Sequence, residues 1–167
     1  MFSHDLFHVR PSSCVLLSII LIYSLPIVAS NPGDFTVVVL PDPQNYSQYN
    51  PLILDAQTQW IAANAVAQNI QLVLDVGDTI NNSRNSTEWQ NANHSIAILD
   101  QSGVAYAIAI GNHDYDTLPP TNRQATYFNQ YFGPSRYSGK PYYGPSNFPA
   151  GSNENFYETF TWGGNRT

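Results

Sequence analysis

The stretch Val104-Ala-Tyr-Ala-Ile-Ala-Ile110, followed at once by Gly111-Asn112-His113-Asp114, decides how this chain is expected to fold. The first seven residues carry no charge and are typical of a strand buried in a sheet. The next four form a turn that presents an amide, an imidazole and a carboxylate at consecutive positions. A buried strand that ends in such side chains is typical of α/β proteins, whose ligands lie beyond the carboxyl ends of the strands.

Two segments upstream repeat this arrangement of a buried strand and a polar turn. The β-branched run of residues 35–40 ends at Pro41, and Asp42 and Gln44 follow. Residues 70–76 form another short apolar run, and Gly77-Asp78 comes directly after it. Each of the three expected strands therefore ends in residues with oxygen or nitrogen donors.

Helical patterns lie between the expected strands. Asn50 followed by Pro51 is a typical helix start, and the pattern runs to about Asn69. The inner face of this helix is expected to hold Ile53, Ala56, Trp60, Ala63 and Ala67. Asn85, with Glu88 three residues later, starts a second helix, and Gly103 ends it. The inner face of the second helix is expected to hold Trp89, Ile96 and Leu99.

The order strand, helix, strand, helix, strand predicts right-handed βαβ units and a parallel sheet, so the expected fold class is α/β. Parallel strands place their carboxyl ends along one edge of the sheet. The three polar turns should therefore converge, although they lie about 35 residues apart in the sequence.

Downstream of the third strand the sequence changes in character. A helix is expected over residues 123–132, and a strand is expected to start within residues 156–162. Between them, residues 133–155 are rich in Tyr, Gly, Pro, Asn and Ser and predict a long loop. The tyrosines of this loop favour a packed loop over a rim around a substrate, and they include Tyr137, Tyr142 and Tyr143.

The 167 residues suffice for one domain after a leader segment. Residues 1–30 combine a polar start, an apolar core over Cys14–Tyr23 and small residues up to Ser30, which is the layout of a cleaved secretory signal peptide. A signal anchor is the alternative. Residues 31–167 are then a secreted domain, which contains no cysteine and cannot form an intramolecular disulfide.

The net charge of −6 argues against two classes of partner. An acidic chain without a basic run is not expected to bind nucleic acid, and no stable membrane association is expected after signal cleavage. Sequons for N-glycosylation begin at Asn45, Asn81, Asn85, Asn93 and Asn165. Asn85, Asn93 and Asn165 are the candidates for N-glycans, because glycans at Asn45 and Asn81 would crowd the polar turns.

The polar turns offer a mixed set of metal ligands. Asp42 and Asp78 supply carboxylates, Gln44 and Asn112 supply amide oxygens, and His113 supplies an imidazole. Oxygen and nitrogen donors of this kind suit Mn²⁺, Fe or Zn²⁺. Each turn alone also fits plain turn chemistry, but their recurrence at three successive strand ends favours a site. The role of Asp75, just before the second turn, stays open between a residue that supports the site and an edge residue.

These motifs resemble those of the calcineurin-like metallophosphoesterase family. The family pattern runs Asp-x-His, Gly-Asp and Gly-Asn-His-Asp/Glu, then a His and Gly-His-x-His. This chain offers Asp42-Pro-Gln44, Gly77-Asp78 and Gly111-Asn112-His113-Asp114 in the same order. The likeness covers about residues 35–162 and is closest to the secreted branch, which often carries Asp-x-Gln and a Gln-x-x-Trp helix such as Gln57–Trp60. It implies the parallel βαβαβ half of a two-sheet α/β/β/α sandwich, with the second sheet largely absent.

The resemblance implies a role for each site residue. Asp42, with Gln44 where most members have a His, would bind the first of two divalent metal ions. Asp78 would bridge both ions, and Asn112 would bind the second. His113 would lie near the leaving-group oxygen of the substrate, with Asp114 fixing its orientation. The implied activity is the hydrolysis of a phosphomonoester or phosphodiester by metal-activated water.

Two departures from the family pattern limit these expectations. Gln44 is a weaker, neutral ligand, and no His follows His113, so the later His and the Gly-His-x-His motif have no counterpart in these residues. The chain is therefore expected to be a fragment or a truncated product that holds one ion at most. The alternative to an active hydrolase is a catalytically inactive secreted relative that retains a partial metal site.

Overall fold

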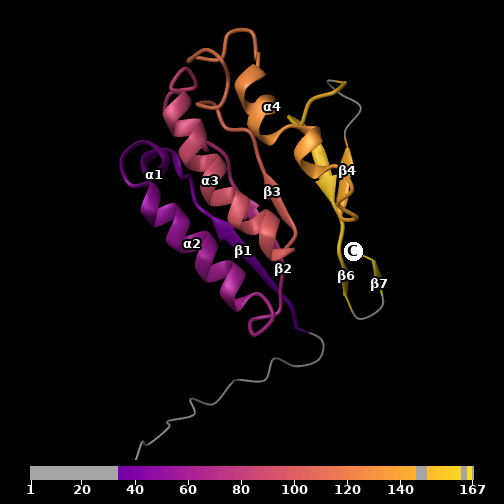
Figure 1. Cartoon of the computed structure of the whole chain (residues 1–167). Coiled ribbons are helices and arrows are strands. Elements are labelled where there is room, and N and C mark those ends of the chain that lie inside the picture. The colour runs from indigo at the N-terminus through magenta and orange to yellow at the C-terminus, as the bar shows by residue number, and fades with distance from the viewer. Residues whose placement is uncertain (1–33, 146–149, 163–164, 167) are drawn as a thin grey trace, which may run out of the picture.

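A computed structural model describes residues 34–145, 150–162 and 165–166 of the chain. Figure 1 shows helices stacked on a small central sheet, followed by a segment of short strands that lies to one side. The signal peptide expected over residues 1–30 lies outside the described residues. Within the described residues, no helix combines the length and the hydrophobicity that are needed to cross a bilayer.

The central sheet has three parallel strands in the order β1-β2-β3. These strands are β1 (Thr36–Leu40), β2 (Ile70–Asp75) and β3 (Tyr106–Ile108). The α/β fold with a parallel sheet that the sequence predicts is confirmed, although β3 is shorter than the apolar run around it. Leu40 pairs with Asp75 and Asp75 pairs with Ile108, so the three strands end level at one edge of the sheet.

Helix α3 (Ser86–Ser102) follows the sequence prediction closely. The side chain of Asn85 caps its start by accepting a hydrogen bond from the backbone N–H of Thr87 at 3.1 Å. Gly103 ends the helix in the left-handed conformation, with φ +76°. The predicted inner face is confirmed, because Trp89, Ile96 and Leu99 are fully buried.

Helix α2 (Pro51–Asn64) begins where the sequence predicts, but Asn50 makes no side-chain capping hydrogen bond and the predicted inner face is wrong. The buried residues are Leu54, Thr58 and Ile61. The five residues expected in the core are exposed, and 54% of Trp60 is accessible to solvent. The polar Thr58 is tolerated in the core because its hydroxyl donates to the carbonyl of Leu54 at 3.2 Å.

Two further helices pack against the helices described above. Helix α1 (Gln44–Tyr49), which the sequence patterns did not predict, begins within the first polar turn, at Gln44. Helix α4 (Thr126–Phe132) starts three residues later than expected, and its aromatic side chains Phe128 and Phe132 are fully buried.

The segment after α4 is not the continuous loop that the sequence predicts. It contains a 3-10 turn over Pro134–Tyr137, and β4 (Tyr143–Pro145) pairs antiparallel with β5 (Phe156–Glu158). A second small antiparallel pair joins β6 (Thr161–Trp162) to β7 (Asn165–Arg166). The tyrosines pack as expected, because Tyr137 is buried and stacks on Tyr143 with ring centroids 4.8 Å apart.

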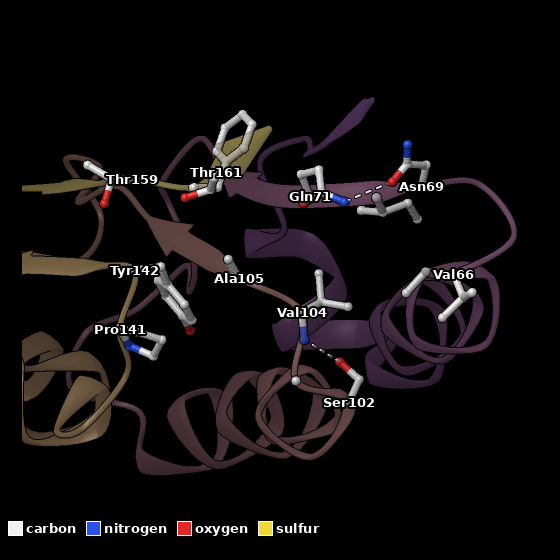
Figure 2. A pocket seen from close by; sticks show the side chains of 14 residues that line it. Val66, Asn69, Gln71, Ser102, Val104, Ala105, Pro141, Tyr142, Thr159 and Thr161 are labelled. Carbon is white, nitrogen blue, oxygen red and sulfur yellow. Dashed lines mark hydrogen bonds between the residues drawn. The ribbon is translucent and has the colours of Figure 1, made fainter. Parts of the chain in front are cut away.

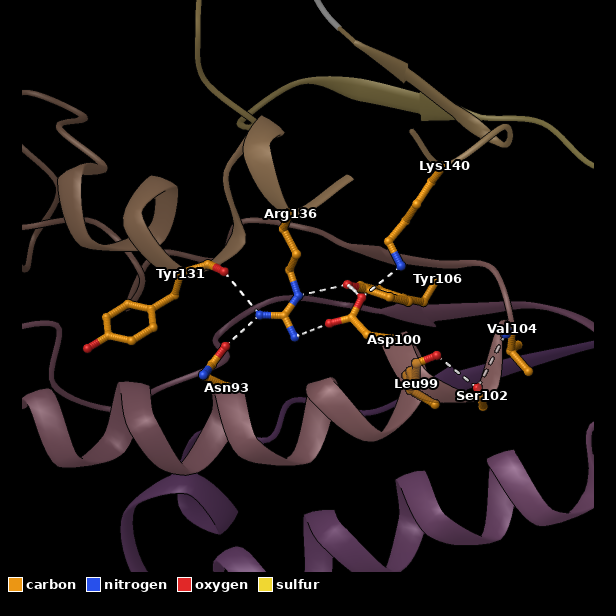
Figure 3. A network of polar contacts seen from close by, with 9 residues as sticks. All are labelled: Asn93, Leu99, Asp100, Ser102, Val104, Tyr106, Tyr131, Arg136 and Lys140. Carbon is orange, nitrogen blue, oxygen red and sulfur yellow. Dashed lines mark hydrogen bonds and ion pairs between the residues drawn. The ribbon is translucent and has the colours of Figure 1, made fainter. Parts of the chain in front are cut away.

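Arg136 joins this segment to α3 and β3, as Figure 3 shows. Its guanidinium group donates to Asp100 Oδ2 at 2.6 Å and to the Tyr106 hydroxyl at 2.7 Å, and Asn93 Oδ1 accepts another of its bonds at 2.5 Å. Lys140 Nζ approaches the other oxygen of Asp100 at 2.8 Å. This network anchors the segment after α4 to α3 and β3.

The hydrophobic core lies between the sheet and the helices. It combines side chains from the strands, from α2 to α4 and from the 3-10 turn, and its largest members include Ile61, Val73, Trp89, Ile96, Leu99, Tyr106, Ile108, Phe128, Phe132 and Tyr137. On the opposite face of the sheet, residues 154–158 and the strands β2 and β3 border a shared hollow.

A separate hollow of about 760 Å³ opens at the amino ends of β2 and β3, away from the polar turns (Figure 2). Val66, Asn69 and Gln71 line it on one side, and Tyr142 and Thr161 line it on the other. The side chains of Gln71 and Asn69 hydrogen-bond to each other at 2.9 Å. The two ends of the sheet therefore carry different surfaces.

Candidate functional site

The second and third polar turns touch each other at the carboxyl edge of the sheet. A Cβ atom on Gly77 would lie 2.8 Å from the backbone nitrogen of Gly111, and one on Gly111 would lie 2.7 Å from Cγ of Asp78. Gly77 also has a φ of +96°, which L side chains rarely adopt. The two glycines therefore allow an approach that residues with side chains would prevent.

The first polar turn brings Asp42 and Gln44 together. Asp42 Oδ1 accepts a hydrogen bond from the backbone N–H of Gln44 at 3.1 Å, and Asp42 Oδ2 accepts one from Gln44 Nε2 at 2.9 Å. Because the amide nitrogen of Gln44 is directed to Asp42, its Oε1 atom is the donor left for a cation. Asp42 itself is exposed at the edge of the sheet.

Asp78 is held by the third turn. Its Oδ1 atom accepts a hydrogen bond from the backbone N–H of His113 at 2.8 Å, and its own backbone has a φ of +52°. Such a conformation is uncommon for a residue other than glycine and is found at functional turns. Asn112, next to His113, is exposed. The structure thus joins Asp78 to the Asn112-His113 turn, as the sequence predicts for parallel strands.

The ring of His113 has a different partner from the one expected. Its Nδ1 atom lies 2.7 Å from the backbone carbonyl oxygen of Asn81. Asp114 instead accepts backbone hydrogen bonds, from Gly111 at 2.8 Å and from Ile80 at 3.3 Å. In this structure Asn81 therefore orients the ring of His113, and Asp114 ties the second turn to the third.

Asp114 is fully buried, which affects its ionisation. Burial raises the pKa of its carboxyl group to about 7, and the negative charge of Asp78 acts in the same direction. The backbone N–H groups of Gly111 and Ile80 oppose this shift. Near neutral pH, both the protonated and the charged form of Asp114 are therefore populated. Its carboxyl group lies between the second and third polar turns, where it accepts from Ile80 and Gly111.

Asp75 is a further carboxyl group at this edge, and the sequence alone left its role open. Only 3% of it is exposed, and its Oδ1 atom accepts a hydrogen bond from the backbone N–H of Gly77 at 2.9 Å. Its Oδ2 atom is buried without a hydrogen-bond partner among the described residues. Burial raises the pKa of Asp75 well above its usual value, and the charges of Asp114, Asp42 and Asp78 add to the shift.

These carboxylates fit part of a cation site. Asp75 has an unpaired buried oxygen, and the charges of Asp114, Asp42 and Asp78 act on this group, which is an arrangement that a cation stabilises. Asp42 and Asp78 offer carboxylate oxygens, and Gln44 and Asn112 offer amide oxygens. In the part of the chain that the structure describes, however, no three His, Cys, Asp or Glu side chains converge closely enough to hold a metal ion. The candidate donors at these turns are thus two carboxylates and two amide oxygens.

A hollow of about 720 Å³ adjoins His113. One wall is the segment 81–84, which includes Arg84, and the other is formed by Asp116, Thr117 and Leu118. A cationic side chain beside an imidazole suits an anionic ligand such as a phosphate group. The second histidine of the described chain, His94, lies elsewhere, on the exposed side of α3 at 3.9 Å from Asp55.

The sequence of this chain is similar to that of a known protein family. The sequence model of the calcineurin-like phosphoesterase family matches residues 35–166. The uncharacterized protein YvnB of Bacillus subtilis (strain 168) is 38% identical over 112 residues, which cover 67% of this chain but only 8% of that protein. The solved structure of a purple acid phosphatase from yellow lupin (Lupinus luteus) seeds aligns with a TM-score of 0.48 and 20% identity, over 80% of this chain and 24% of that one.

Proposed function

This chain belongs to the calcineurin-like phosphoesterase family, a family of metallophosphoesterase-type hydrolases, and on that basis we propose that the carboxyl edge of its sheet hydrolyses a phosphomonoester or phosphodiester. The observation that carries the proposal is the convergence of the polar turns, in which Asp78 accepts a hydrogen bond from the backbone of His113. The second and third turns, which carry Asp78 and His113, are far apart in the sequence, and Gly77 and Gly111 allow them to come into contact.

The family implies divalent metal ions, and we propose Asp42, Gln44, Asp78 and Asn112 as the residues that hold them. Bound Mn²⁺, Fe or Zn²⁺ would supply Lewis-acid stabilisation of the phosphoryl oxygens and lower the pKa of a bound water. Asp42 keeps the amide of Gln44 turned through two hydrogen bonds, so that Oε1 is free to bind. The unpaired Oδ2 atom of Asp75 supports a cation at this edge.

His113 is proposed to stabilise or protonate the leaving-group oxygen. Its ring is held through Nδ1 by the carbonyl of Asn81, which leaves Nε2 for the substrate. The adjoining hollow offers room for the rest of the substrate, with Arg84 as a partner for its negative charge. Asp114 contributes by fixing the backbone of the third turn through Gly111.

A second function is favoured by one observation, the lack of three converging His, Cys, Asp or Glu side chains among the described residues. The alternative is a catalytically inactive relative that retains a partial metal site. The chain spans 8% of the length of its Bacillus subtilis relative, so the activity of the whole protein is itself part of the proposal.

Hydrolysis of bis(4-nitrophenyl) phosphate and 4-nitrophenyl phosphate by the full chain with Mn²⁺ tests the two functions. Turnover that Asp78→Ala and His113→Ala abolish would support the hydrolase, with Glu154→Gln as a variant that removes a negative charge elsewhere. Binding of one ion without turnover would support the inactive relative. Turnover that neither substitution changes would refute the assignment of the site.

Secretion and glycosylation are proposed with the function. Asn93 accepts a hydrogen bond from Arg136 with its side-chain oxygen, and a glycan would be attached through its nitrogen. Asn85 accepts from the backbone of Thr87 and donates through Nδ2 to Glu88, so a glycan on that nitrogen would leave one N–H for the bond to Glu88. The side chain of Asn165 lies outside the described part of the structure. A loss of mass on enzymatic deglycosylation of the secreted chain would identify the occupied sequons.

A further inference from the structure

The carboxylate of Glu88 lies inside the segment that leads from the second polar turn to α3. Only 1% of Glu88 is exposed. Its Oε2 atom accepts hydrogen bonds from the backbone N–H groups of Asn81 and Asn82, both at 2.8 Å. Its Oε1 atom accepts a third bond, from Asn85 Nδ2 at 2.9 Å. A buried charge with three donors of this kind fixes the backbone that surrounds it.

Helix capping alone does not account for these bonds. Glu88 is the third residue of α3, and in a capping box such a residue reaches back to the backbone N–H of the capping residue, here Asn85. The Asn85 N–H instead donates to the carbonyl of Asn82 at 2.8 Å. Glu88 reaches beyond the cap, to residues that lie six and seven positions before it. Its charge therefore organises the turn as well as the helix end.

Asn81 connects this carboxylate to His113. Its backbone N–H donates to Glu88 Oε2, and its backbone carbonyl lies 2.7 Å from His113 Nδ1. A carbonyl oxygen can only accept a hydrogen bond, so Nδ1 of His113 must carry a proton for this bond to exist. In the neutral ring, Nε2 is then the unprotonated nitrogen, and it can donate to a leaving-group oxygen only after it has taken up a proton, with Nδ1–H still held by Asn81.

We propose that Glu88 is a positioning residue for His113: by holding the Asn81–Asn82 backbone, it places the carbonyl that fixes His113 in the Nδ1–H tautomer. The catalytic consequence rests on the proposed function, because only there does His113 meet a substrate. The tautomer itself does not depend on that function. A Glu88 that served only as a helix cap would stabilise α3 and leave the ring of His113 unchanged.

The test is ¹⁵N NMR of the histidine rings in the full chain at about pH 8.5, above the usual titration range of imidazole. The wild type should show one Nδ1–H tautomer for His113. Glu88→Gln should replace it with a mixture of tautomers, because an amide cannot accept all three bonds with its single oxygen. The exposed His94 serves as an internal reference that reports on the folded state of α3.

Two controls separate the positioning role from general damage. Asn81→Ala keeps the backbone carbonyl and should keep the Nδ1–H tautomer, and Glu154→Gln makes the same chemical change away from the turn. If Glu88→Gln does not fold, Glu88→Asp retains the charge but is shorter, and it should give the same mixture of tautomers. A wild-type His113 in the Nε2–H form, or a single Nδ1–H form that persists in both folded Glu88 variants, would overturn the proposal.

A kinetic measurement distinguishes failure of this inference from failure of the proposed function. In an active chain, Glu88→Gln should lower kcat about tenfold or more and leave KM nearly unchanged, as is typical when a partner that orients a reacting group is lost. An unchanged kcat in a variant that has lost the tautomer would refute the catalytic consequence. An inactive wild type with the expected tautomer would refute the function and leave the positioning of His113 in place.

Discussion

Gly111 lies so close to Asp78 that a methyl group in its place could not be accommodated without movement of the second turn. Its Cβ would lie 2.7 Å from Asp78 Cγ. We expect Gly111→Ala to lower the free energy of unfolding by about 1–3 kcal/mol, the usual effect of overpacking, and to weaken Mn²⁺ binding because Asp78 is displaced. Urea denaturation and a metal titration measure the two effects.

Gly139→Ala is the matched control for this substitution. Gly139 has a φ of +77° and an added Cβ would meet no atom within 4 Å, so alanine there costs only backbone strain of about 1–2 kcal/mol. The control should leave the Mn²⁺ affinity unchanged. Equal Mn²⁺ affinities in the two variants would contradict the idea that the close approach of Gly111 positions Asp78.

Glu158 provides a pH-dependent prediction away from the polar turns. Both oxygens of its carboxyl group are buried without hydrogen-bond partners among the described residues, and burial raises its pKa to about 8 although Lys140 opposes the shift. The folded chain therefore holds this proton more tightly than the unfolded chain. Stability from Glu158 is complete below about pH 4.5 and is lost as the pH rises through about 8.

We expect Glu158→Gln to remove this loss, so that its stability exceeds that of the wild type by an amount that grows between about pH 5 and 9. Urea denaturation at a series of pH values measures the difference. Glu154→Gln removes a carboxyl group from the same segment and is the control variant. A difference for Glu158→Gln that shrinks as the pH rises would show that the sign is wrong.

Among the structural elements, the 3-10 turn is joined to α3 by Arg136, whose guanidinium group donates to Asp100 (Figure 3). Burial alone would raise the pKa of Asp100, but hydrogen bonds from Lys140 and Tyr106 and the charge of Arg136 hold it below its usual value. Arg136→Met should lower the free energy of unfolding by about 3–5 kcal/mol, because it leaves Asp100 and Tyr106 without their buried partner.

Lys140→Met provides the comparison, since Lys140 binds the same carboxylate with a more exposed side chain. Its loss should lower the free energy of unfolding by about 1 kcal/mol or less. Chemical denaturation of the two variants and of the double variant measures both effects and their coupling. Equal decreases in the free energy of unfolding of the two single variants would show that the several hydrogen bonds from Arg136 stabilise the chain no more than the single contact of Lys140.

The elements also show where sequence patterns were sufficient. The sequence of α3 carries a strong signal at each end, Asn85 and Gly103, so its bounds were predicted correctly. Polar residues lie between the apolar positions of its inner face, so the buried face was predicted correctly as well. Helix α2 has apolar residues at successive positions, Leu52, Ile53 and Leu54, so the helical period fits more than one face. Packing against α3 buries Leu54 and leaves Ile53 in solvent, which the sequence alone could not decide.

The candidate site was likewise predictable only in part from the sequence. Parallel topology was enough to predict that Asp78 and His113 would meet, because it fixes which edge the turns share. The partner of the His113 ring was not predictable, because it is the backbone carbonyl of Asn81, and any amino acid at that position would supply a carbonyl. Asp75 was left open because its burial depends on the register between β2 and its neighbours.

At the scale of the whole molecule, the site stands on a small sheet of short strands, so its geometry depends on links between turns as much as on strand pairing. Asp114 supplies such links by joining the backbones of Gly111 and Ile80. Asp75 supplies another within its own turn, through Gly77. These carboxyl groups also repel one another and Asp78 and Asp42, which raises the pKa of Asp75 beyond the effect of burial. Without a cation, the site is a source of instability.

The whole chain should therefore become more stable when Mn²⁺ binds, by about 2.7 kcal/mol at an ion concentration one hundred times the Kd, and EDTA should reverse the effect. Asp75→Asn removes this buried ionisable group, whose pKa is raised well above its usual value, and keeps the acceptor for the Gly77 N–H. We expect it to raise the melting temperature of the metal-free chain and to reduce the increase that Mn²⁺ produces, because less repulsion remains for the ion to offset. Thermal unfolding with EDTA and with Mn²⁺ measures both effects, with Asp34→Asn, just before the amino end of β1 at the other edge of the sheet, as the control for a charge lost elsewhere. An Asp75→Asn chain that melts lower than the wild type in EDTA, or that gains as much from Mn²⁺, would mean that Asp75 is a structural residue without electrostatic coupling to the site.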